Sequence, residues 1–109
     1  MDLAMKNYFF SKLSGINYRI ATHEGNANRR LASAAPEILF QLHEPYVPEK
    51  YKKDFKKLVS IIEKTAKSLP EGVMTPIRIE GIRNRTAAKY IQLLLDIQNH
   101  LDVEQRELL

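Results

Sequence analysis

Apolar residues at helical spacing constrain the fold of this chain more than any other feature, and they are clearest in residues 48–69. The apolar positions of this segment are Tyr51, Phe55, Leu58, Val59, Ile62, Ala66 and Leu69. Steps of three and four residues place side chains on one face of an α-helix, whereas the side chains of a half-buried strand alternate. The opposite face is mostly lysine, at Lys50, Lys52, Lys53, Lys56, Lys57, Lys64 and Lys67. The segment is therefore predicted to be an amphipathic helix with one buried face.

Two preceding segments repeat this pattern and are also predicted to be helices. They are residues 2–24, with the stripe Met5, Phe9, Leu13, Ile16 and Ile20, and residues 27–43, with the stripe Leu31, Ala35, Ile38 and Leu42. Gly25 is suited to end the first helix, and Asn26 or Asn28 to cap the second. Glycine inside a helix costs about 1 kcal/mol relative to alanine, and proline lacks the amide donor. We therefore expect one bent helix across Gly15 and a kink or a restart at Pro36.

A last helix is predicted over residues 75–101. Its apolar positions are Ile79, Ile82, Thr86, Tyr90, Leu93, Leu94, Ile97 and Leu101. Thr75 can cap this helix with Pro76 at its first position. The competing interpretation is a short strand over residues 77–80, where apolar and polar side chains alternate, although Pro76 removes a ladder donor there. The tail, residues 102–109, either frays or extends the helix.

Four amphipathic helices with short connections predict an all-α fold, a four-helix and mostly antiparallel bundle. The 109 residues are the size of one compact domain, so we expect a single helical domain over residues 1–109. The absence of cysteine excludes a disulfide scaffold, a thiol nucleophile and a cysteine-based zinc site. No apolar run is long enough to cross a membrane, and the N-terminus lacks the pattern of a signal peptide. We therefore expect a cytoplasmic protein with no membrane partner.

Arg83 falls within the apolar sector of the last predicted helix. A guanidinium left unpaired in a protein interior costs several kcal/mol. One interpretation is a structural arginine whose head group meets a carboxylate such as Glu37, Glu44 or Asp54. The alternative is a contact to an anion or a phosphate in a cleft near the start of the helix. The sequence predicts a buried or cleft arginine and leaves its role open.

A second set of basic residues is predicted to face outward on the last two helices. Its members are Lys52, Lys53, Lys56, Lys57, Lys64, Arg78, Arg85 and Lys89. Lysine and arginine beside phosphates release counterions, so a joined surface of this kind binds nucleic acid independently of its sequence. Lysine-rich faces are also the common way to solvate a helix, and no known nucleic-acid-binding motif is present. Accessory nucleic-acid binding is therefore an alternative function.

Residues for catalysis or metal binding form no recognisable pattern. The chain has no glycine-rich phosphate loop and no Gly-x-Ser-x-Gly motif. His23, His43 and His100 lack the spacings by which one helix supplies two metal ligands. Arg19 and His23 lie one helical turn apart, which leaves a small nuclease or hydrolase as a third hypothesis. We expect no enzyme activity, no metal and no cofactor.

Three apolar residues, Phe10, Phe40 and Ile61, lie off the predicted stripes. Exposed apolar patches of a few hundred Å² usually mark interfaces, although a wider core would also account for these residues. The first hypothesis is therefore a non-enzymatic interaction module. It forms a homo-oligomer or binds another protein partner through its apolar faces.

Three groups of residues carry a resemblance to known proteins. They are Glu24-Gly25 with Arg30-Leu31, Val47-Pro48-Glu49 with Phe55 and Leu58, and Ile82-Arg83-Asn84-Arg85-Thr86-Ala87-Ala88-Lys89. Over residues 11–101 the chain resembles a loose group of short, uncharacterised bacterial helical proteins that end in a similar Arg-Asn-Arg-Thr-Ala-x-Lys helix. The resemblance implies a small all-α bacterial protein and implies no activity. Gly15 and Pro36 stand where the resemblance implies uninterrupted helix.

Overall fold

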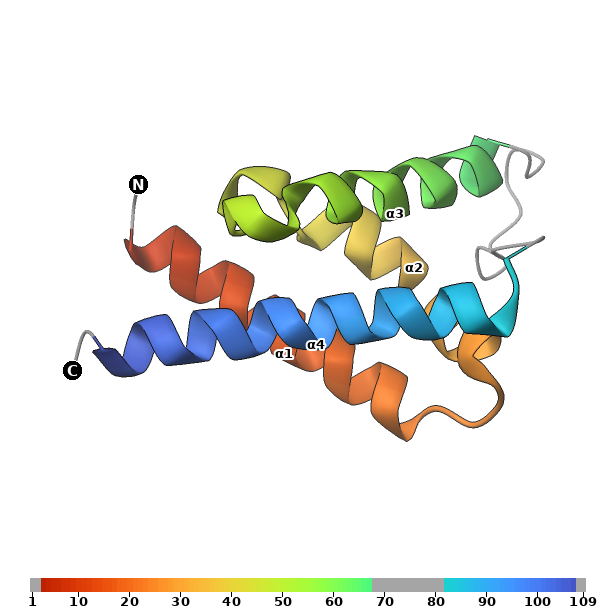
Figure 1. Ribbon diagram of the computed structural model, residues 1–109, viewed down its shortest axis with the longest axis horizontal. Helices are drawn as coiled ribbons and strands as arrows, with labels where there is room; N and C mark the ends of the chain where they lie inside the picture. The colour runs from red at the N-terminus through yellow and green to blue at the C-terminus, as the bar shows by residue number, and fades with distance from the viewer. Residues whose placement is uncertain (1–2, 68–81, 108–109) are drawn as a thin grey trace.

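The computed structural model of the protein describes residues 3–67 and 82–107. Its elements are α1 (Leu3–Thr22), α2 (Ala27–Gln41), a single turn of 3-10 helix η1 (Glu44–Tyr46), α3 (Glu49–Lys67) and α4 (Asn84–Glu107). The described residues contain no strand, and the helices pack into one bundle (Figure 1). The predicted all-α four-helix bundle is confirmed for this part of the chain. None of its helices is long and apolar enough to cross a membrane.

The core is built from the predicted apolar stripes. Its buried side chains include Phe9, Leu13, Ile16 and Ile20 of α1, Leu31, Ala35 and Ile38 of α2, Phe55, Leu58 and Ile62 of α3, and Leu93, Leu94 and Ile97 of α4. Met5 departs from the prediction, because 40% of its surface is exposed. In the first turn of α4, Ala87 is buried, whereas Thr86, which was predicted to be in the core, is exposed. The predicted core side chains Ala66, Leu69 and Ile79 lie outside the described side chains.

The start of α4 differs from the prediction. The helix begins at Asn84, and Ile82 and Arg83 are not helical, so one continuous helix from residue 75 is wrong. The choice between helix and strand for residues 75–81 lies outside the described residues. Hydrogen bonds from Asn28 account for the start of α4 at Asn84. The side-chain Nδ2 of Asn28 donates to the carbonyl oxygen of Ile82 at 2.5 Å, and its backbone N–H donates to Asn84 Oδ1 at 3.1 Å. These bonds tie Ile82 and Asn84 to the start of α2. At its other end α4 reaches Glu107, past the predicted end at residue 101.

Helix α1 continues through Gly15, which confirms the prediction of one helix there, and α2 continues through Pro36. Gly15 lies inside α1, and a Cβ added there would have no neighbouring atom within 4 Å. Pro36 lies inside α2, so the predicted restart at this residue is wrong. Burial of Ala35 and Ile38 on either side of the proline keeps this segment packed against the core. Core packing therefore outweighs the local preference of these residues.

The connection between α1 and α2 uses the residues that were expected to form it. Gly25 has a φ of 112°, a left-handed conformation that glycine adopts without strain. Asn26 then caps α2, because its side chain accepts a hydrogen bond from the backbone N–H of Arg29 at 3.1 Å. The chain reverses between α1 and α2 over these few residues (Figure 1).

Hydrogen bonds fix how α1 lies against α4. Asn17 Nδ2 donates to the carbonyl oxygen of Leu94 at 3.1 Å and to Gln98 Oε1 at 2.7 Å. Nearer the N-terminus of α1, Gln105 Nε2 donates to Asn7 Oδ1 at 3.3 Å. Lower-numbered residues of α1 therefore meet higher-numbered residues of α4. The face of α4 away from α1 packs beside α3, where the candidate site lies.

Candidate protein-binding site

A groove runs between α3 and α4, and Tyr51 lies at its middle. Its two adjoining hollows share Tyr51 and Asp96. One hollow is lined in addition by Asn99, His100, Val103, Glu104 and Glu107, and the other by Asp54, Lys57, Lys89, Tyr90, Gln92 and Leu93. Most of these residues come from one side of α4, which places them along the helix in the order of their numbers. We call this surface the α3–α4 groove.

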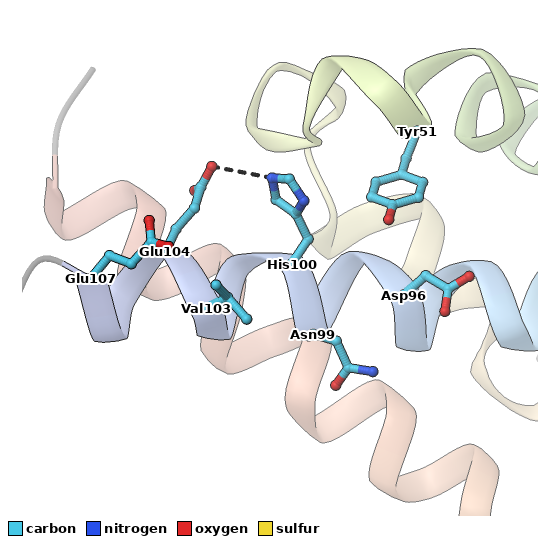
Figure 2. A pocket seen from close by; sticks show the side chains of 7 residues that line it. All are labelled: Tyr51, Asp96, Asn99, His100, Val103, Glu104 and Glu107. Carbon is cyan, nitrogen blue, oxygen red and sulfur yellow. Dashed lines mark hydrogen bonds and ion pairs between the residues drawn. The ribbon is translucent and has the colours of Figure 1, made fainter.

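Contacts at the middle of the groove orient its aromatic side chains. The rings of Tyr51 and His100 meet edge to face, with centroids 5.9 Å apart and planes at 86°. The Nε2 atom of His100 lies 3.2 Å from Glu104 Oε1 (Figure 2). Lys50 Nζ lies 5.5 Å from the centre of the Tyr51 ring. Aromatic pairs with this geometry contribute about 0.5–1.5 kcal/mol beyond their buried area, so Tyr51 and His100 hold α3 and α4 in a defined relation.

Charge is unevenly distributed along the groove. Lys57 and Lys89 lie in one hollow, whereas Glu104 and Glu107 lie in the other. The distance along α4 from Lys89 to Glu107 is about 27 Å, from the rise of 1.5 Å per residue. Asp96 lies between them and accepts a hydrogen bond from Gln92 Nε2 at 2.9 Å. The groove therefore has one end where two lysines lie beside Asp54 and Asp96, and an anionic end, with the pair of Tyr51 and His100 between them.

The predicted basic surface is interleaved with acidic residues. Lys52 pairs with Glu49 at 3.2 Å, and Lys56 lies 3.6 Å from Glu44. Asp54 and Asp96 line the same hollow as Lys57 and Lys89. The structure brings Lys57 and Lys89 together and leaves Lys53 and Lys64 exposed elsewhere on α3. Arg85 lies at the start of α4, and Arg78 lies outside the described residues.

The prediction of a buried Arg83 is wrong. Arg83 is exposed, immediately before the first residue of α4. Its carbonyl oxygen accepts the backbone N–H of Ala87 at 3.0 Å. The error arose because a helical wheel places Arg83 in the apolar sector only if the helix continues back to residue 75. The predicted partners Glu37 and Glu44 pair instead with Arg19 and Lys56.

The residues of the nuclease hypothesis have separate partners. Arg19 forms an ion pair with Glu37 of α2. His23 Nδ1 lies 2.6 Å from the carbonyl oxygen of Glu24. Within the described part of the chain, no group of three histidine or acidic residues is arranged to hold a metal ion. The geometry around Arg19 and His23 therefore adds nothing to the hypothesis of a shared catalytic site.

The apolar residues outside the predicted stripes divide into two kinds. Phe10 and Ile61 are half-buried, and Ile61 packs against the core. Phe40 is 73% exposed, as is Tyr18, which the sequence analysis did not single out. Val103 lies in the groove and is 53% exposed. Of these residues, Val103 is the one that lies beside the charged and aromatic side chains of the groove.

The groove itself was not predicted from the sequence. From the sequence, His100 was considered as a metal ligand, and Tyr51 as part of the core. The spacing of four residues between His100 and Glu104 was a readable signal for one side of the groove. The contact between Tyr51 and His100 had no such signal, because it joins helices that are far apart in the sequence.

Comparisons with known proteins return no family model, no curated protein and no solved structure that matches the chain. The resemblance to short bacterial helical proteins therefore stays a prediction.

Proposed function

We propose that the protein is a non-enzymatic interaction module that self-associates through the α3–α4 groove. The observation that carries the proposal is that the lysines of the groove, Lys57 and Lys89, lie at one end, beside Asp54 and Asp96, whereas Glu104 and Glu107 lie at the other. A two-fold axis brings the same surface of two copies together in opposite directions. Under that operation the lysine end of one copy meets the glutamate end of the other.

The residues of α4 support a specific register. If two copies of α4 cross a two-fold axis at the level of residue 98, Lys89 of each copy faces Glu107 of the other, because both lie nine positions from the axis. In the same register Asp96 faces His100, and Leu93 faces the exposed Val103. Opposite charges therefore meet at the ends, Asp96 meets the imidazole of His100 near the axis, and Val103 meets the largely buried Leu93 between them.

The composition of the groove favours a protein surface over a polyanion. Asp54, Asp96, Glu104 and Glu107 would repel phosphates along most of its length. An aromatic centre with a charged rim is the usual arrangement of a protein interface. A second copy of the protein matches both the centre and the rim. Its Val103 and His100 lie against the centre of the groove, and its charged residues lie against the rim.

Charge exchange tests the proposal. Lys89→Glu and Glu107→Lys each place like charges together twice in the dimer, so each is expected to raise the dissociation constant about 10-fold. This follows from roughly 0.5–1 kcal/mol for each exposed pair. The double variant Lys89→Glu/Glu107→Lys restores opposite charges and is expected to recover wild-type association. Sedimentation equilibrium at several protein concentrations measures the constant for each variant.

Lys64→Glu is the matched control, because Lys64 is exposed on α3, does not line the groove and undergoes the same change of charge. We expect its dissociation constant to equal that of the wild type. A wild-type protein that stays monomeric at millimolar concentration overturns the proposal. A double variant that associates no better than its single variants overturns the two-fold register.

A further inference from the structure

The starts of α2 and α4 are joined at one end of the bundle. Asn28 donates its backbone N–H to Asn84 Oδ1 at 3.1 Å and its side-chain Nδ2 to the carbonyl oxygen of Ile82 at 2.5 Å. Figure 1 shows the orange start of α2 beside the cyan start of α4. Residues within two positions of these hydrogen bonds are therefore held close together, although they are more than fifty residues apart in the sequence.

Four arginines flank this junction. Arg29 and Arg30 follow Asn28 in the first turn of α2, while Arg83 and Arg85 lie on either side of Asn84. Three of the four are exposed, and Arg30 is half-buried with its Nε donating to the carbonyl oxygen of Gly25 at 3.0 Å. We call these four residues the arginine cluster.

The arginine cluster is not neutralised by the described part of the chain. None of its members forms an ion pair there, whereas Arg19, Lys52, Lys56 and Arg106 each pair with a carboxylate. Glu24, in the connection before α2, forms no ion pair with the described residues either, so the four arginines and Glu24 together carry a net charge of +3. A concentration of one sign of charge on an exposed surface attracts a ligand of the opposite sign.

The chemistry of the arginine cluster favours phosphate. A guanidinium presents a planar fork of donors that matches phosphate oxygens. No aromatic residue lies within two positions of any of the four arginines, so nothing beside them in the sequence would stack on a base. The four residues come from the starts of two helices and three of them are exposed, which suits a chain of phosphates better than one small enclosed anion. Contacts of this kind position a nucleic acid without reading its sequence.

We propose that the arginine cluster binds the phosphate backbone of nucleic acid. Arg85 also belongs to the basic surface that was predicted from the sequence. The lysines of that surface are not part of the arginine cluster, which contains Arg29, Arg30 and Arg83 instead. Four phosphate contacts predict a slope of about −3.6 for the logarithm of the association constant against the logarithm of salt concentration, for a duplex. Affinity is then expected to fall roughly 100-fold between 50 and 200 mM salt.

Fluorescence anisotropy with a labelled duplex of mixed sequence tests the proposal. The variant Arg83→Gln/Arg85→Gln changes two exposed side chains, so it is expected to retain the wild-type circular dichroism spectrum and thermal midpoint. It should reduce the magnitude of the salt slope by about 1.8, because each lost contact removes about 0.9. Lys53→Gln/Lys64→Gln is the matched control, since it removes two exposed charges from α3, and it should leave the slope unchanged.

The outcomes separate local binding from general charge. An equal loss of slope in the arginine and lysine variants overturns the proposal, because net charge alone would then explain binding. Absence of binding by the wild type at 50 mM salt also overturns it. Competition by inorganic phosphate that matches the duplex, at equal ionic strength and equal phosphate concentration, would instead identify a site for a small anion and overturn the assignment to nucleic acid.

Discussion

Asn17 of α1 donates a hydrogen bond from Nδ2 to the backbone carbonyl oxygen of Leu94 in α4, at 3.1 Å across the buried contact between the two helices. Asn17 is the buried polar side chain among the described residues, and Nδ2 also donates to Gln98 Oε1 at 2.7 Å. Gln98 in turn donates from Nε2 to Ser14 Oγ at 3.1 Å. A sliding or rotation of α1 against α4 would break this network and leave polar groups buried without partners.

Replacement of Asn17 is therefore expected to destabilise the fold in a graded way. Asn17→Ala removes both hydrogen bonds and is expected to lower the free energy of unfolding by about 1–3 kcal/mol. Asn17→Asp places a carboxylate beside the oxygen atoms of Leu94 and Gln98 in a buried site, so the loss should be larger, about 3 kcal/mol or more. Urea denaturation followed by circular dichroism measures both values.

Asn7→Ala provides the control, because Asn7 also joins α1 to α4, through Gln105, but lies at the exposed end of the contact. Its effect should stay within about 0.5 kcal/mol. Equal losses for Asn7→Ala and Asn17→Ala would contradict a structural role that depends on burial.

The two glycines of the first connection and first helix should respond in opposite directions to alanine. Gly25 has a φ of 112°, and a Cβ there would lie 3.1 Å from the Arg29 side chain, so Gly25→Ala is expected to lower the free energy of unfolding by about 1–2 kcal/mol. Gly15 lies inside α1 with open space where its Cβ would be, so Gly15→Ala should raise it by about 0.5–1 kcal/mol. Thermal and urea denaturation of both variants give the signs, and a stabilising Gly25→Ala would contradict the described turn.

Periodicity was sufficient to identify most of the core. Phe55, Leu58 and Ile62 are buried because a single apolar face on a helix can be sequestered only against other helices, whatever their order. The start of α4 could not be predicted in the same way. It depends on hydrogen bonds from Asn28 to Ile82 and Asn84, residues more than fifty positions away, and local patterns contain no information about such partners.

The α3–α4 groove and the arginine cluster also depend on contacts between residues far apart in the sequence, which local patterns do not show. The side chains of Tyr51 and His100 were each assigned to a helix from the sequence, but their contact depends on which helices are neighbours. The lysines of α3 were correctly expected on an outer face, yet their neutralisation by Glu44 and Glu49 requires the packed structure or close reading of local spacing. Arg29 and Arg83 join one cluster only after the starts of α2 and α4 meet.

Burial differs between Leu58, which lies on a predicted apolar stripe, and Phe40, which lies off the stripes. Leu58 of α3 is fully buried, so Leu58→Ala is expected to lower the free energy of unfolding by about 2–5 kcal/mol through lost burial and a cavity. Phe40 is 73% exposed, so Phe40→Ala should change it by less than about 0.5 kcal/mol. Denaturation at low protein concentration, where self-association does not contribute, measures both. A large loss for Phe40→Ala would contradict its outward position on α2.

Self-association through the groove should weaken as salt rises. The proposed contacts between Lys89 and Glu107 join exposed side chains, and the Debye length falls from about 10 Å at 0.1 M salt to about 3 Å at 1 M. We expect the dissociation constant to rise several-fold over this range of sodium chloride concentration, measured by sedimentation equilibrium at neutral pH. The double variant Lys89→Glu/Glu107→Lys should show the same dependence, because it exchanges the charges without removing them. A dimer that is unchanged or strengthened by salt would instead be held by apolar contacts, such as those of Phe40 and Tyr18, and the groove would not be its interface.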